Sequence, residues 1–237
     1  NLGGGAVTLG AATLQTTAAL SSDNAIVLTN ANSTIDTGAH AVELLGAVSG
    51  KGTLNKTGTG TLRLTGVNSQ NGVFVRGGTL EFNSDAALGA AGSTVTIAEN
   101  TTLRTLDSFT IEHRLQVNNT QQAAFDTNGH DIVMAGDITG AGIVRKLGEG
   151  TLTLTGENTQ VLIDVYGGRV VAASQSAVGA TGGDIILREN GGFTAGADMT
   201  LTQNVHVTGS NAVFDTGTFD VELTGTADGA ACLIKQG

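Results

Sequence analysis

The sequence GKGTLNKTGTGTLRLTG at residues 50–66 returns ninety residues later as GAGIVRKLGEGTLTLTG at residues 140–156. The match continues without a gap, so that Ala87-Leu88-Gly89 corresponds to Ala177-Val178-Gly179. In both copies leucine alternates with threonine or a charged residue, and glycine interrupts the alternation every few positions. A period of two is typical of short strands that bury one face. The long fixed period indicates a solenoid, in which each repeat stacks on its neighbour.

Three copies of this unit fill the chain, at residues 3–90, 92–180 and 182–237. The third copy stops inside the glycine-threonine-leucine block, and the opening Asn1-Leu2-Gly3 resembles the end of a preceding unit. We therefore expect residues 1–237 to form a single solenoid that is a fragment of a longer array.

The fold predicted from these observations is all-β, a right-handed single-stranded parallel β-helix. We expect about 22 residues per turn and roughly ten turns, so that ninety residues span about four turns. The chain contains 36 glycines and no proline, and proline is excluded from strands that are paired on both sides. The alternative fold is a β-sandwich or an up-and-down barrel. For residues 107–116 alone, the alternative to a strand is a helix. The side chains expected to point inward are Leu54, Leu62, Leu64, Leu80, Val144, Leu152, Leu154 and Val170.

Composition excludes several classes of partner. The formal net charge is -10, which argues against binding to nucleic acid or to an anionic lipid surface, because both require clustered Lys and Arg. No apolar run approaches the ~18 residues of a membrane span, so we expect no membrane insertion by this segment. Cys232 is the single cysteine, which rules out an internal disulfide and leaves its own role open.

The repeated residues resemble a known family. The run at residues 50–66, followed by Asn68, Gly77-Gly78-Thr79-Leu80 and Ala87-Leu88-Gly89, resembles the passenger-associated transport repeat of bacterial autotransporters (type V secretion), as found in AIDA- and ShdA-like adhesins. One departure is that Gln70 and Gln160 stand where the family often has an aromatic residue.

The resemblance implies export across the outer membrane and a β-helical stalk at the cell surface or secreted from it. It implies a non-catalytic adhesin segment, whose partners are a host extracellular-matrix protein, a surface glycan or the same protein on neighbouring cells. The first alternative is a structural spacer that supports secretion and presents a distal domain. The second is an enzyme that acts on polysaccharide, since parallel β-helices also serve in that role.

Catalytic and metal-binding patterns are scarce. No Gly-x-Ser-x-Gly nucleophile motif occurs, and the histidines lack partners at metal-ligand spacing. Asp131 and Asp220 are repeat-equivalent and are expected to lie about 19 Å apart along the rod, too far for the carboxylate pair of a glycosidase. The prediction is therefore no enzyme, no cofactor and no metal.

The one candidate ligand-contact surface consists of Phe74, Arg76, Asp164 and Tyr166. If Val73, Val75, Ile163 and Val165 point inward, these four side chains face solvent. Exposed aromatic residues on a sheet face suit a glycan or a protein partner, although they also suit the cover beneath a local loop.

Overall fold

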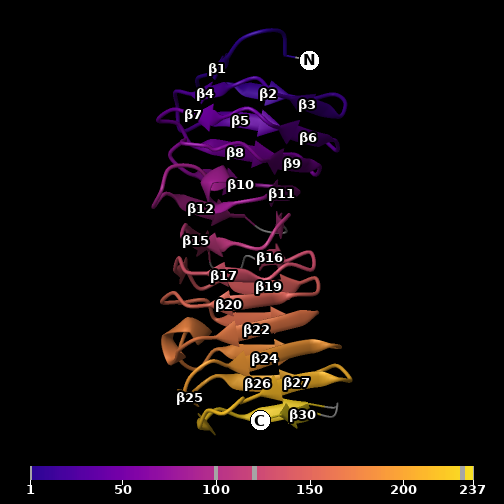
Figure 1. Cartoon of the computed structure of the whole chain (residues 1–237), viewed down its shortest axis with the longest axis vertical. Helices are drawn as coiled ribbons and strands as arrows, with labels where there is room; N and C mark the ends of the chain where they lie inside the picture. Colours follow the sequence, from indigo (N-terminus) through magenta and orange to yellow (C-terminus); the bar gives the residue numbers. More distant parts are fainter. Residues whose placement is uncertain (1, 99–100, 119–121, 230–232, 237) are drawn as a thin grey trace.

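The computed structural model describes residues 2–98, 101–118, 122–229 and 233–236. The chain coils around one axis into a rod, with the N-terminus at one end and the C-terminus at the other (Figure 1). The strand pairs that the described residues form are parallel, and partners in neighbouring turns are 18 to 23 residues apart, as for Leu62 with Leu80 and Leu80 with Leu103. The described residues form no α-helix. The predicted parallel β-solenoid of about ten turns is confirmed, and the sandwich, the barrel and the helix at 107–116 are wrong.

Three sheets form most of the wall. In the described part of the chain the long sheet has eleven strands: β3 (Leu20–Ser22), β6 (Ala41–Leu44), β9 (Thr61–Leu64), β11 (Thr79–Phe82), β13 (Thr101–Thr105), β16 (Gln122–Asp126), β19 (Ile143–Leu147), β21 (Leu162–Val165), β23 (Asp184–Leu187), β26 (Asn204–Val207) and β29 (Ala227–Gly229). The N-terminal sheet has β2 (Thr13–Gln15), β5 (Ser33–Asp36), β8 (Leu54–Thr57), β10 (Val73–Val75), β12 (Thr94–Ile97), β15 (Arg114–Val117) and β18 (Ile138–Thr139). The C-terminal sheet has β14 (Thr110–Ile111), β17 (Ile132–Met134), β20 (Thr151–Leu154), β22 (Gly168–Ala172), β24 (Gly191–Ala195), β27 (Ala212–Asp215) and β30 (Leu233–Gln236).

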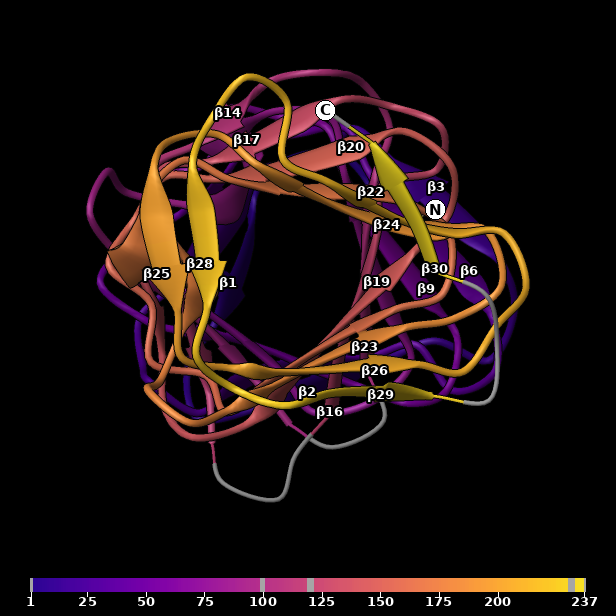
Figure 2. The same cartoon turned by 90° about the horizontal axis from the view of Figure 1, so that it is seen from below.

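Smaller elements complete the coil. A sheet near the N-terminus contains β1 (Val7–Leu9), β4 (Ile26–Leu28) and β7 (Val48–Ser49), and a pair near the C-terminus contains β25 (Met199–Leu201) and β28 (Val221–Leu223). Two short 3-10 turns, η1 (Asp85–Leu88) and η2 (Gln175–Val178), form equivalent corners in two copies. Viewed along the axis, the strands enclose an approximately triangular interior (Figure 2).

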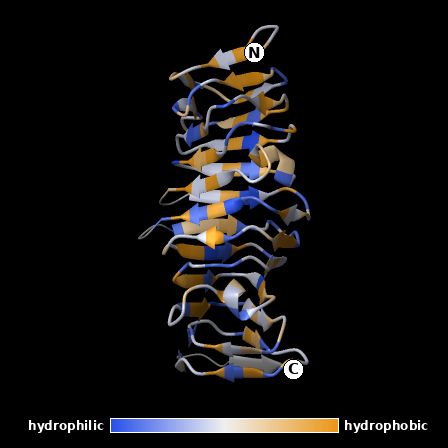
Figure 3. Ribbon diagram, turned by 90° about the vertical axis from the view of Figure 1, so that its left-hand side faces the viewer, coloured by the Kyte–Doolittle hydropathy of each residue, from blue (hydrophilic) through white to orange (hydrophobic). Residues whose placement is uncertain are grey.

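Alternation along each strand places aliphatic side chains inside. All eight leucines and valines predicted to point inward are at most 1% exposed, and hydrophobic and hydrophilic residues alternate along the strands of the rod (Figure 3). Each fully buried aliphatic side chain contributes on the order of 1.5–3 kcal/mol. The core is therefore one continuous column of buried hydrophobic residues.

The ninety-residue unit does not contain a whole number of turns. Within a turn β9 follows β8, and the long sheet passes from β9 through β11, β13 and β16 to β19, which is four turns. Because β19 is the repeat equivalent of β8 rather than of β9, the unit measures four turns plus one further side of the triangle. Equivalent strands thus lie in different sheets, and β6, β17 and β28 lie on different sides in Figure 2. This corrects the expectation of four turns.

Candidate binding surfaces

The four residues of the predicted ligand-contact surface fall into two separate places. Phe74 and Arg76 lie on or beside β10 of the N-terminal sheet, whereas Asp164 and Tyr166 lie on or beside β21 of the long sheet. The guanidinium carbon of Arg76 lies 3.6 Å above the centre of the Phe74 ring, and Arg76 Nε donates to Asn55 Oδ1 at 3.1 Å. The first pair thus forms a closed stack on the surface.

Tyr166 is the centre of the second place. The guanidinium carbons of Arg145 and Arg188 lie 4.9 and 4.6 Å from the centre of its ring, and 41% of Tyr166 is exposed. Asp164 was expected to face solvent but is only 2% exposed, because arginines from the turns before and after it cover the carboxylate. Arg188 Nε and Nη2 donate to its two oxygens at 2.6 and 3.1 Å.

A hollow of about 310 Å³ lies beside this cluster. It is lined by Thr101, Thr102, Gln122, Ala124, Arg145, Leu147 and Tyr166. In the register of the long sheet, Ala124 stands between Thr102 on β13 and Arg145 on β19. The alanine methyl group is too short to fill the space between those two side chains, so the column of outward side chains is interrupted at this point.

A ladder of alternating charge runs along the long sheet on the N-terminal side of this hollow. Glu43, Arg63, Glu81, Arg104 and Asp126 occupy adjacent positions on five successive strands. The Glu81 carboxylate accepts hydrogen bonds from Arg63 Nε at 2.9 Å and from Arg104 Nη1 at 3.3 Å. Arg104 Nε also donates to Asp126 at 2.8 Å. The hydrogen bond to Asp126, followed by the charge of Asp126 and the hydrogen bond and charge of Glu81, raises the pKa of Arg104, so its guanidinium group stays protonated.

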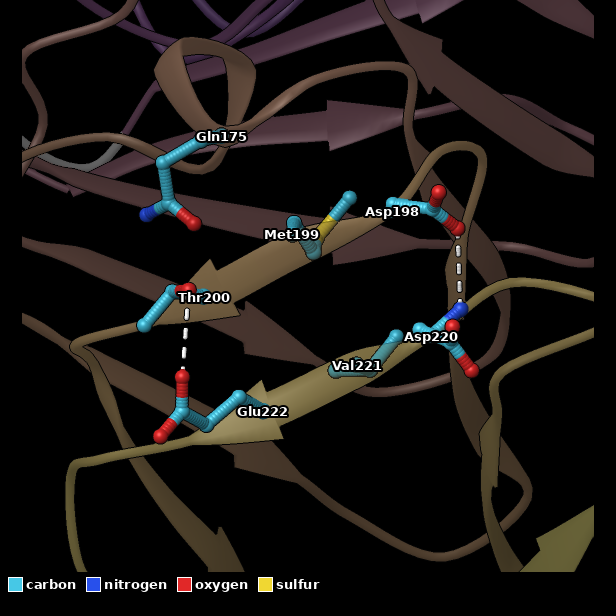
Figure 4. A pocket seen from close by; sticks show the side chains of 7 residues that line it. All are labelled: Gln175, Asp198, Met199, Thr200, Asp220, Val221 and Glu222. Carbon is cyan, nitrogen blue, oxygen red and sulfur yellow. Dashed lines mark hydrogen bonds between the residues drawn. The ribbon is translucent and has the colours of Figure 1, made fainter.

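A second hollow, on the side of the rod formed by β25 and β28, is acidic. It has a volume of about 880 Å³ and is lined by Gln175, Asp198, Met199, Thr200, Asp220, Val221 and Glu222. Figure 4 shows η2 with Gln175 on one side and the side chains of β25 and β28 on the other. Asp198 Oδ1 accepts the backbone N–H of Asp220 at 2.9 Å, and Thr200 Oγ1 lies 3.5 Å from Glu222 Oε2. The carboxylates therefore serve in part to connect one turn to the next.

Asp131 and Asp220 do not share a site. Asp131 precedes β17 in the C-terminal sheet, whereas Asp220 precedes β28 in the small pair near the C-terminus. Their separation is therefore around the rod as well as along it. Among the described residues there is also no group of three or more His, Cys, Asp and Glu side chains placed to hold a metal ion.

Two of the histidines, His113 and His206, contact carboxylates from neighbouring turns, a relationship that their sequence spacing does not reveal. His113 is 1% exposed, and its ring nitrogens lie 2.7 Å from Asp85 Oδ1 and 3.0 Å from the carbonyl oxygen of Ala90. His206 is partly exposed and lies 2.7 Å from Asp228 Oδ1. The hydrogen bond to Asp228, followed by the one to Asp184, raises the pKa of His206. His40 and His130 are partly exposed.

Two buried lysines, which sequence reasoning did not single out, cross-link the turns from within. The ammonium group of Lys56 donates to the carbonyls of Thr57, Gly58 and Gly77 at 2.9–3.0 Å and to the Thr37 hydroxyl at 3.1 Å. Its equivalent Lys146 donates to the carbonyls of Leu147, Gly148 and Gly167. Burial lowers the pKa of each lysine to about 8, although nearby Asp36 and Asp126 respectively act in the other direction.

Gln70 and Gln160 are internal as well. Both are at most 1% exposed, and their Nε2 groups donate to the carbonyls of Leu88 at 3.1 Å and Val178 at 3.0 Å. Such residues can be identified in the sequence because they lie an even number of positions from a buried residue on the same strand. Lys56 is two residues after the buried Leu54, and so points to the same side of its strand.

No helix in the described part of the chain has the length and apolar character needed to cross a membrane.

Comparison with known proteins agrees with the repeat pattern. Residues 54–82 and 144–170 match the Passenger-associated-transport-repeat. Over 161 residues the chain is 32% identical to the "Adhesin BmaC autotransporter" of Brucella suis biovar 1 (strain 1330), a match that covers 65% of this chain and 4% of that relative. The chain thus spans a small part of the length of the relative that it matches. No solved structure is significantly similar to it. The chain therefore carries autotransporter passenger repeats and is a distant homologue of an adhesin autotransporter.

Proposed function

We propose that this chain is an adhesive, non-catalytic segment of an autotransporter passenger, exported across the outer membrane and exposed at the cell surface or secreted. The observation that carries the proposal is the 32% identity to an adhesin autotransporter, together with two passenger repeats. Its partner is a host matrix protein, a surface glycan or the same protein on a neighbouring cell.

The outer surface suits adhesion through several weak contacts. The hollows of the long sheet and of the β25–β28 pair are lined by polar, charged and aromatic side chains on rigid strands. Contacts of this kind are individually weak, but their combined strength grows steeply when several engage at once. A rod made of stacked turns holds such contacts at fixed distances from one another.

The experiment is to couple the purified chain to beads at a controlled density. Beads that carry an adhesive segment are expected to clump with one another or to bind surfaces coated with matrix proteins or glycans. Beads that carry the chain unfolded by heat serve as the control. The proposal would be contradicted if beads carrying the folded chain neither clump nor bind any of these surfaces, at a density at which beads carrying an established adhesin do so.

The alternative is a spacer that presents another domain and supports export by folding outside the cell. Its support is the cross-linking of successive turns by Lys56, Lys146 and the charge ladder, which stiffens the rod. A spacer is expected to leave the beads dispersed and unattached, while its shortening reduces the adhesion of the complete protein. The two functions therefore give opposite results in the same bead assay.

A further inference from the structure

The hollow above Ala124 is bordered by a group of three charged side chains that carries one net positive charge. Two arginines, Arg145 and Arg188, flank the single carboxylate of Asp164. Arg188 occupies both carboxylate oxygens, at 2.6 and 3.1 Å. Arg145 Nε lies 3.5 Å from Asp164 Oδ2 and, in the described structure, has no hydrogen-bond partner. One positive charge is therefore in excess here, in a chain whose net charge is -10.

A second carboxylate near the hollow, that of Asp126, is ion-paired with an arginine that it shares with Glu81. Asp126 lies two residues after Ala124 on β16 and accepts Arg104 Nε at 2.8 Å. Among the described residues Asp126 forms its ion pair with Arg104, and the ion pair of Arg145 is with Asp164, so an anion that enters the hollow can pair with Arg145. The guanidinium group of arginine matches the planar geometry of a carboxylate or sulfate and can donate two parallel hydrogen bonds.

The remaining lining residues suit a sugar ring. Thr102 and Gln122 supply a hydroxyl and an amide that can bind ring hydroxyl groups, and Leu147 and the exposed part of Tyr166 supply an apolar wall. A volume of about 310 Å³ lies at the lower end of the range of roughly 300–1,000 Å³ for ligand pockets. It accommodates one or two units of an oligosaccharide rather than a long chain.

We propose that this hollow, defined by Thr102, Gln122, Ala124, Arg145 and Tyr166, binds an acidic sugar unit of a glycan. The acid group pairs with Arg145, the ring hydroxyls bind Thr102 and Gln122, and the apolar face of the ring lies against Tyr166 over the methyl group of Ala124. This site rests on the proposed adhesive function and gives its ligand a chemical class, an anionic glycan.

Titration of the complete chain with trigalacturonate, followed by calorimetry or by NMR at low ionic strength, tests the proposal. We expect saturable binding of trigalacturonate and no binding of the neutral maltotriose. A sulfated disaccharide in a third arm shows whether the site recognises a carboxylate or any anion on a sugar. Arg145→Gln is expected to weaken binding about tenfold or more, the loss of a charge-assisted hydrogen bond.

Ala124→Leu is expected to weaken binding to a similar extent by filling the hollow. Two matched control variants introduce the same residue types, glutamine and leucine, at positions outside the hollow. Arg114→Gln removes an exposed arginine from the N-terminal sheet, and Thr34→Leu enlarges the residue that corresponds to Ala124 in the first copy. Both controls are expected to bind trigalacturonate as the unchanged chain does, and the cooperative unfolding of each variant shows that it is folded.

The proposal is overturned if millimolar trigalacturonate does not bind, or if Arg145→Gln and Ala124→Leu bind it as tightly as the controls do. The bead assay separates this failure from that of the adhesive function. If beads carrying both hollow variants adhere as strongly as unchanged beads, adhesion stands and the acidic-sugar site is rejected.

Discussion

The ammonium group of Lys56 in one turn donates a hydrogen bond of 2.9 Å to the carbonyl oxygen of Gly77 in the next turn. Lys146 and Gly167 repeat this relationship one copy later, at 3.1 Å. Both lysine side chains are inaccessible to solvent, and their direct partners are neutral oxygens. An ammonium group supplies three donors, and three carbonyls surround each one. The Thr37 hydroxyl is a fourth acceptor for Lys56. The interior of the rod therefore contains fixed charges whose cost is offset by hydrogen bonds between turns.

The first prediction is that the rod becomes more stable as the pH rises from about 8 to about 10.5. The pKa of both lysines is lowered to about 8 in the fold, whereas an unfolded lysine titrates near 10.4. Between these values the unfolded chain binds more protons, so the free energy of unfolding increases with pH. The increase is complete above the unfolded value and is lost as the pH falls through about 8. It reaches as much as about 3 kcal/mol per lysine.

Urea unfolding of the chain at a series of pH values measures this increase. A chain with Lys56→Met and Lys146→Met together is expected to show a much flatter profile, whereas Lys51→Met, at an exposed position, is expected to keep the slope. A free energy of unfolding that falls between pH 8 and 10 would show that the lysines are not buried as described.

The second prediction concerns Lys56→Met at neutral pH. Methionine fills much of the same volume but leaves the carbonyls of Gly58 and Gly77 without the lysine donor, and an unsatisfied buried polar group costs about 1–3 kcal/mol. Removal of a buried charge offsets part of that cost. The expected net loss is about 2 kcal/mol in the free energy of unfolding by urea. A more stable variant would mean that burying the charge costs more than leaving the carbonyls unpaired.

The third prediction concerns the charge ladder. Glu81→Gln removes the carboxylate shared by Arg63 and Arg104. Because the Glu81 side chain is 9% exposed, the expected loss is about 1–2 kcal/mol, more than the ~0–1 kcal/mol of a surface pair. Arg114→Gln breaks the exposed 3.6 Å pair with Asp137 and is expected to change stability by less than about 0.5 kcal/mol. Equal effects of the two variants in thermal unfolding would argue against a cooperative ladder.

The fourth prediction concerns the close stacking of turns at Gly60. A methyl group there would collide with the backbone of His40 in the preceding turn, so Gly60→Ala is expected to cost about 3 kcal/mol, as for an overpacked core. Gly4 has no neighbouring atom within 4 Å of such a group. Gly4→Ala is therefore the control, expected to change the urea midpoint little. A neutral Gly60→Ala would require a wider spacing between these turns.

The sequence predicts the coil because its pattern is local. Leu62 and Leu64 alternate with Thr61 and Arg63, and this alternation alone determines which side chains face inward. The ninety-residue period then requires stacking, since a single unit of this kind leaves its strand edges unpaired. These two features were sufficient to predict parallel pairing.

The relative position of residues from different turns is what the sequence does not contain. Turns vary from 18 residues between Leu62 and Leu80 to 23 between Leu80 and Leu103. Four turns take 84 residues, from Leu62 to Lys146, so a ninety-residue repeat ends one side further around the rod. For that reason Phe74 and Tyr166 lie in different sheets, and the arginines that bury Asp164 come from turns that no repeat alignment places beside it. Prediction of such a site requires the register of each turn.

The extra side per repeat has a geometric consequence for any array built from these units. Corresponding patches in successive copies face different sides of the rod, because each copy is rotated about the axis relative to the one before it. A ligand that approaches such a filament from any side therefore encounters the patch of one copy or another. Attachment then requires no rotation of the filament, and one straight ligand chain laid along it contacts only a fraction of the equivalent patches.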